Sequence, residues 1–199
     1  MLASKFVVSD DVMKIFGEGK YVDAKGRRRK IMGVGTFPDE IPLQSLNMEG
    51  SLSFGKISCD EIQMSGECFG ESLTANNFSV AGVLRVNSVN VTHNLKVDGS
   101  LKVDNLIAKE IFIRSRLGSV DTVKCQRIKI FDDSFTDVKD SRVCIKSLEA
   151  DTVELTNSAV AVIRCRDAFI GENCSVEKLF VTGKCTVAPT STVSEMIRT

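Results

Sequence analysis

The sequence predicts an all-β protein, a single-stranded β-solenoid with about 16–17 residues per coil and three short strands in each coil. Three observations favour this fold. Apolar residues recur at a nearly fixed interval, they alternate with polar residues as in half-buried strands, and proline, which cannot donate a ladder hydrogen bond, is absent between residues 43 and 188. Coils of this length leave no room for helices between the strands.

The repeat is defined by an apolar residue, here called the anchor, which glycine follows two positions later in the first six coils. A fixed period of this kind indicates stacked structural repeats. The anchors follow one another at nearly equal intervals along the chain: Ile15, Ile31, Met48, Met64, Val80, Val97, Ile113, Ile130 and Ile145. The glycines are Gly17, Gly33, Gly50, Gly66, Gly82 and Gly99. We expect each glycine at a bend where the backbone of the next coil comes close.

Alternation within each coil predicts the strands. The residue two positions before the anchor is apolar in every coil except at Arg29, and the residue between the two is usually polar. The residue four positions before the anchor is always polar, so we expect it at an exposed corner. Beyond the glycine, pairs such as Leu52 and Phe54 predict a second strand, and residues such as Ile57 and Leu73 predict a third.

We divide the chain into an N-terminal extension (residues 1–11), the solenoid (residues 12–187) and a polar C-terminal tail (residues 188–199). After Ile145 the spacing does not fix the register, because several segments carry the same alternation. These segments are 153–155, 168–170 and 179–181.

Composition and charge exclude several classes of protein. With 26 basic and 26 acidic residues among 199, the formal net charge is zero, which excludes a uniformly basic nucleic-acid binder. The seven cysteines form no Cys-x-x-Cys pair and there is one histidine, so we expect no disulfide framework, no zinc site and no cofactor. No apolar stretch is long enough to span a membrane and the N-terminus lacks the apolar region of a signal peptide, so we expect a cytoplasmic protein.

The two ends of the solenoid are the first candidate site. Strands at an end present unpaired N–H and C=O groups, which the chain itself or another molecule must cover. We expect an interface for self-assembly there, formed by apolar residues of the end coils. These residues are Met13, Ile15, Leu179, Phe180 and Val181. The alternative is that residues 1–11 and 188–199 fold over the ends as caps.

A dense run of basic residues is the second candidate site. It consists of Lys25, Arg27, Arg28, Arg29 and Lys30. Such a run can bind an acidic partner or anionic lipid headgroups, and we expect it to contact a membrane surface. Tyr21 is the only aromatic residue interleaved with the basic residues, which disfavours nucleic acid as the partner. A solvated corner is the alternative.

Five phrases carry a resemblance to a known family: Leu95-Lys-Val-Asp-Gly-Ser-Leu-Lys-Val-Asp, Ser65-Gly-Glu-Cys, Lys14-Ile-Phe-Gly-Glu-Gly, Ser147-Leu-Glu-Ala-Asp-Thr-Val-Glu-Leu and Phe169-Ile-Gly-Glu-Asn-Cys. They resemble the bactofilins, and more narrowly the polymer-forming cytoskeletal proteins of Gram-positive bacteria. The resemblance covers about residues 12–187. The sequence departs from the family's pattern after Gly99, where Ser115 and Asp132 stand in place of the glycine.

The resemblance implies a right-handed β-helix that polymerises end to end without nucleotide. It also implies a role in cell shape, envelope organisation or motility. The partners would be copies of the protein itself, envelope or motility proteins, and the inner face of the cell membrane.

The single histidine raises an enzymatic alternative. Hexapeptide-repeat acyltransferases, which are also solenoids, use a histidine as general base, and Ile170-Gly-Glu-Asn-Cys-Ser-Val looks like one of their phrases. Their coils are longer, and His93 falls in the polar corner position of this repeat. We therefore expect His93 to be a solvated residue rather than a base.

Together these observations predict a cytoskeletal protein that is not an enzyme, that has no small-molecule substrate and that assembles with copies of itself. Two alternatives stay open. One is a solenoid enzyme of the acyltransferase type, and the other is an adaptor that binds proteins on its flat faces without polymerising.

Overall fold

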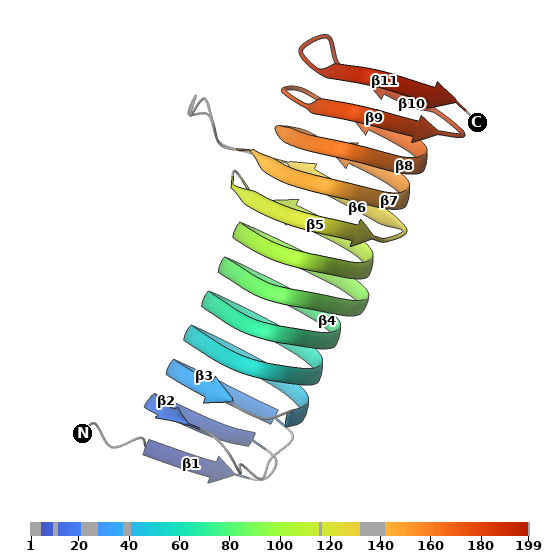
Figure 1. Cartoon of the computed structure of the whole chain (residues 1–199). Helices are drawn as coiled ribbons and strands as arrows, with labels where there is room; N and C mark the ends of the chain where they lie inside the picture. The colour runs from blue at the N-terminus through green and yellow to red at the C-terminus, as the bar shows by residue number, and fades with distance from the viewer. Residues whose placement is uncertain are drawn as a thin grey trace.

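The computed structural model describes residues 5–9, 12–20, 28–37, 41–115, 117–131 and 142–198. The described residues contain strands and no helix, which confirms the all-β solenoid (Figure 1). The strands are β1 (Lys5–Ser9), β2 (Val12–Lys20), β3 (Arg28–Phe37), β4 (Ile41–Arg114), β5 (Gly118–Lys124), β6 (Arg127–Phe131), β7 (Val143–Leu155), β8 (Ser158–Ile170), β9 (Ser175–Val181), β10 (Cys185–Val187) and β11 (Thr192–Arg198). The longest, β4, has 74 residues and winds through several coils without a break.

Neighbouring coils pair as parallel strands, so equivalent residues of the repeat lie above one another. Ile15 pairs with Ile31, Ile31 pairs with Met48, and farther along Ile113 pairs with Ile130. Each step along this stack is about 4.8 Å, the spacing of hydrogen-bonded strands. The predicted register is therefore confirmed for these anchors.

The prediction is wrong for the ninth anchor, Ile145, which lies on a different strand of its coil. Ile130 pairs with Leu155, whereas Ile145 pairs with Val120 on one side and Val160 on the other. The chain between β6 and β7 is longer than at the same corner of other coils, so the step from Lys129 to its neighbour in the next coil is 25 residues. The segment 143–145 carries the same alternation as an anchor strand, and the pattern alone could not separate the two.

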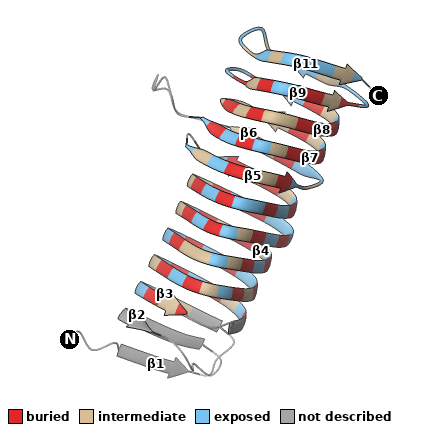
Figure 2. Ribbon diagram, viewed as in Figure 1, coloured by how far each residue is buried: buried red, intermediate tan, exposed pale blue. Residues whose placement is uncertain are grey.

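Each coil has three faces, named here by one coil of β4. The first face carries the anchors, with Leu46 and Met48 pointing inward, the second carries Leu52 and Phe54, and the third carries Ile57 and Cys59. All six side chains are buried. Buried and exposed residues alternate along β4 (Figure 2). The inward side chains form one continuous apolar core along the solenoid axis, and removing this apolar surface from water is the main driving force for folding.

In the coils whose anchor is followed by glycine, this glycine is required by the corner between the first and second faces. Gly50, Gly66, Gly82 and Gly99 have φ between +127° and +134°, where a side chain is strained. The stacking leaves no space either. A Cβ on Gly66 would lie 2.0 Å from the carbonyl oxygen of Gly50, one coil away, and a Cβ on Gly82 would lie 2.1 Å from that of Gly66.

Strand pairing extends beyond the expected limits of the solenoid. β11 lies within the segment expected to be a polar tail, and it pairs in parallel with β9. β1 lies within the expected N-terminal extension, and it pairs with β2 in the antiparallel direction. Both terminal segments thus contribute strands to the sheet.

We predict that Gly66→Ala lowers the free energy of unfolding by about 2–4 kcal/mol, because the new Cβ meets both the positive φ and the Gly50 carbonyl oxygen. The free energy is measured by urea denaturation. The control is Ser65→Ala at the exposed neighbouring position, which should change stability by less than about 0.5 kcal/mol. Equal stability of the two variants would contradict the close-packed corner.

Candidate functional site

At the N-terminal end, the predicted assembly residues lie on the second strand of the stack. Met13 pairs with Val8, and Ile15 pairs with Phe6, both through the antiparallel contact of β2 with β1. The other edge of β2 pairs with β3. β1 therefore covers the edge that we expected to be open, as in the alternative in which the terminal segments cap the ends.

At the C-terminal end, Leu179, Phe180 and Val181 lie on β9, one coil inside the last strand. Leu179 and Val181 are fully buried, and the guanidinium of Arg164 lies 4.8 Å from the centre of the Phe180 ring. β11 covers this strand, with Met196 opposite Leu179. The assembly role of the three residues stays a prediction, but the described chain places them behind another strand.

The outermost strands at this end are β10 and β11. Within the described chain β10 pairs only with β8, and β11 pairs only with β9, so one edge of each has no strand partner (Figure 1). Val187 and Val193 pack on the core but are only partly buried, and 42% of Met196 is exposed. The apolar core therefore opens to the surface at this end.

Sequence reasoning missed this last coil because the segment 188–199 is mostly polar. The available signal was the spacing from Val176 to Val193, and again from Leu179 to Met196, which equals a common interval between anchors. Polar contacts at the corner and along the strand hold β11 in place. The Cys174 amide donates a hydrogen bond of 2.8 Å to the Ser191 hydroxyl, and Lys178 Nζ lies 3.3 Å from a Glu195 carboxylate oxygen.

The structure describes only part of the basic run. Lys25 and Arg27 lie outside the described residues, whereas Arg28 and Arg29 begin β3 and pair with Ser45 and Leu46. Lys30 Nζ lies 3.8 Å from a Glu49 carboxylate oxygen in the next coil. At least one cation of the run is thus partly neutralised within the protein itself, at an exposed position where such a pair contributes little stability.

His93 lies exposed at the corner between the third face and the first, as predicted for this position of the repeat. Its neighbour Asn94 donates a hydrogen bond of 3.2 Å to the side-chain oxygen of Asn77 one coil away. The interval between the inward residues Val91 and Leu95 is one residue longer than at most equivalent corners, so this corner is slightly enlarged.

Most of the cysteines belong to the core. Burial raises the pKa of the Cys68 thiol to about 12 and that of Cys59 to about 11. Cys68 is completely buried and packs as a small apolar residue of the core. Cys165, which two arginines flank in the sequence, is also buried, and burial raises its pKa to about 11. A neutral, enclosed thiol is a poor nucleophile.

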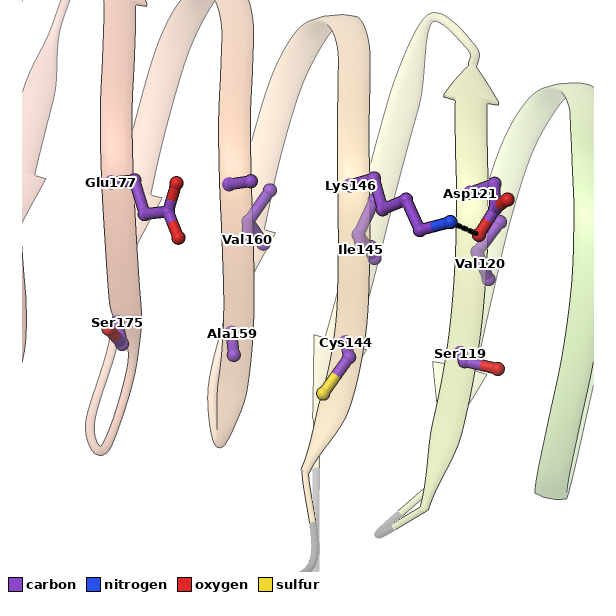
Figure 3. A pocket seen from close by; sticks show the side chains of 11 residues that line it. Ser119, Val120, Asp121, Cys144, Ile145, Lys146, Ala159, Val160, Ser175 and Glu177 are labelled. Carbon is purple, nitrogen blue, oxygen red and sulfur yellow. Dashed lines mark ion pairs between the residues drawn. The ribbon is translucent and has the colours of Figure 1, made fainter.

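Cys144 is the exposed exception, and it lies in a hollow on the outer side of the second face (Figure 3). The hollow encloses about 250 Å³ and crosses β5, β7, β8 and β9. Its centre is low because Ala159 and Ala161 present only methyl groups, while Lys146 and Glu177 stand on either side. Lys146 Nζ lies 2.8 Å from an Asp121 carboxylate oxygen, which fixes one wall.

The described residues contain no group of three or more histidine, cysteine, aspartate or glutamate side chains arranged to hold a metal ion. In the same part of the chain there is no helix of the length and apolarity needed to span a membrane. Neither a family model, nor a curated protein, nor a solved structure matches this chain. The candidate sites that the described residues offer are the open C-terminal edge and the outer side of the second face.

We predict that Cys144 reacts fastest of the seven cysteines with a thiol-exchange reagent in the native protein at pH 8. Cys68 should react slowest, because a pKa of about 12 leaves on the order of one thiol in ten thousand ionised at that pH. Mass spectrometry of labelled peptides locates each modification. Cys144→Ser should remove the fast phase, and all seven cysteines of the wild-type chain should react in urea. Rapid labelling of Cys68 would contradict its burial.

Proposed function

We propose that this protein is a bactofilin-like structural protein that self-assembles end to end, without nucleotide, into filaments. Two features support the proposal. The chain forms a β-solenoid whose coils stack in one direction, and the phrases quoted above resemble that family over most of the solenoid. In this proposal the filament is a scaffold for cell shape, envelope organisation or motility. It requires neither catalysis nor a cofactor.

The observation that carries the proposal is the open edge of the last coil. β10 and β11 offer N–H and C=O groups on a side where the described chain supplies no partner strand. Edge strands of this kind readily pair with another chain. The partly exposed core residues Val193 and Met196 add apolar surface to the same end, so a second copy stacked there would gain both hydrogen bonds and apolar burial.

The basic run supports a proposal for where the filaments lie in the cell. Lys25, Arg27, Arg28, Arg29 and Lys30 would attract anionic lipid headgroups, each exposed cation near the surface contributing about 1 kcal/mol. Filaments would then lie along the inner face of the cell membrane in the cytoplasm. The Lys30–Glu49 pair reduces the contribution of one of these cations.

A second candidate function is an adaptor that binds proteins on its faces and does not polymerise. The antiparallel contact of β1 with β2 favours this candidate, because it ends the parallel ladder at the N-terminal end. A filament that continues through this end must pair with β1 rather than extend the parallel stack. The two candidates differ in one property, the oligomeric state of the purified protein.

We predict that the wild-type protein forms filaments in negative-stain electron microscopy without nucleotide and that Met196→Asp abolishes them. The substitution places a charge on the outermost strand, where stacking would desolvate it. The matched control is Ile107→Asp, which introduces the same charge at an exposed apolar position on the outer side of the third face. It should leave the filaments intact.

Sedimentation gives the quantitative measurement. Wild type and Ile107→Asp should pellet, and Met196→Asp should stay in the supernatant with an unchanged circular dichroism spectrum. Pelleting of Met196→Asp at the wild-type level would refute assembly through the C-terminal edge. A wild-type protein that stays monomeric at high concentration would replace the filament proposal with the adaptor.

A further inference from the structure

A groove runs along the outer side of the second face. A second hollow, of about 460 Å³, lies next to the one in Figure 3, and Ser119 lines both. Together they cross six successive passes of the chain, from Val83 to Ser175. Five strand spacings of about 4.8 Å make the groove about 24 Å long, which is the length of about seven extended residues. It ends at β9, one strand short of β11, and its lining includes no residue of β10 or β11.

The second hollow exists because a small residue separates two larger apolar ones. Val83, Ser100 and Leu117 occupy the same position in three successive coils, since Gly82 stacks under Gly99 and the Leu101 amide donates to the Leu117 carbonyl. Leu117 is 63% exposed, the highest exposure among the large apolar residues of the described chain. The side chains of Val83 and Leu117 thus form two walls, with Ser100 between them, wide enough for an aliphatic side chain.

The same hollow is lined by two cations and by no carboxylate. Arg85 and Lys102 occupy equivalent positions in neighbouring coils, and neither forms an ion pair with any described residue. Like charges directly opposite one another on paired strands are unfavourable. Arg85 also lies over the Phe69 ring, with its guanidinium carbon 5.7 Å from the ring centre, which holds the cation at the surface.

Several other cations of the described solenoid are paired with a carboxylate one coil away, whereas Arg85 and Lys102 are not. Lys129 Nζ lies 2.6 Å from a Glu154 oxygen, and on the second face itself Lys146 is paired with Asp121. The groove is thus positively charged between Val83 and Leu117, whereas farther along Lys146 is paired with Asp121 and Glu177 adds a carboxylate. A ligand that suits it has negative charge at one end only.

We propose that this groove binds an extended acidic peptide segment of a partner protein. Its carboxylates pair with Arg85 and Lys102, one of its aliphatic side chains lies between Val83 and Leu117, and small uncharged residues continue across Ala159. The length and shallowness of the groove suit a peptide, and its lining residues include no aromatic side chain on which a nucleic-acid base could stack. The proposal goes beyond self-assembly and holds for the monomer and for the filament.

The test uses a fluorescein-labelled octapeptide and the full-length chain. One half of the octapeptide alternates glutamate and leucine, and the other half consists of glycine, alanine and serine. It is made in both sequence orders, because the groove does not set the direction of the peptide. Fluorescence anisotropy should show saturable binding of at least one of the two peptides. A peptide with glutamine in place of glutamate should bind at least about tenfold more weakly.

Two groups of variants locate the binding. Leu117→Asp, and separately the double variant Arg85→Glu with Lys102→Glu, should each weaken binding at least about tenfold. The matched controls are Ile107→Asp on the third face and Lys109→Glu at the exposed corner after it, and they should bind within about twofold of wild type. Circular dichroism and the urea midpoint establish that every variant is folded.

Several outcomes would overturn the proposal. These are the absence of saturable binding, equal binding of the glutamine peptide, and unchanged binding by Leu117→Asp. Loss of filaments in Leu117→Asp with no peptide bound by the wild type would assign the groove to a second copy of the chain instead. Met196→Asp should bind the peptide as wild type does, so failure of end-to-end assembly and failure of the groove are separable results.

Discussion

The close approach of successive backbones at the corner between the first and second faces is the constraint on which the rest of the structure depends. Strands that pair in parallel at about 4.8 Å leave no space for a side chain that points along the axis. Gly50, Gly66, Gly82 and Gly99 satisfy this constraint with positive φ and no Cβ. As long as glycine recurs, one corner geometry repeats, and β4 continues unbroken for 74 residues.

The corner changes once glycine is lost. Ser115 is buried, and its hydroxyl accepts a hydrogen bond of 3.1 Å from the Leu117 amide at this corner. Later corners use Asn157 and Asn173 in the left-handed region, with φ of 49° and 56°. These bends no longer need the same number of residues. The step of 25 residues from Ile130 to its partner Leu155 in the next coil is the extreme case.

The two candidate surfaces arise from different properties of the same stack. The C-terminal edge follows from the fact that a stack of strands must stop, and the last coil carries apolar residues such as Val193 whose outer side the described chain leaves uncovered. The groove follows from irregular side-chain size on the second face, where Ser100 and Ala159 are small beside Val83 and Leu117. One surface therefore suits a copy of the chain, and the other suits a different partner.

The sequence by itself determined the repeat, the inward positions and the glycine corners, because the period and the alternation are local properties of the chain. It could not place Ile145, since an inserted corner shifts the register and 143–145 alternates like any other strand of the coil. It also could not show that β11 covers Leu179, because pairing depends on backbone groups that every residue carries. The groove was decided only by the tertiary structure, since Arg85, Lys102 and Leu117 become neighbours when the coils stack.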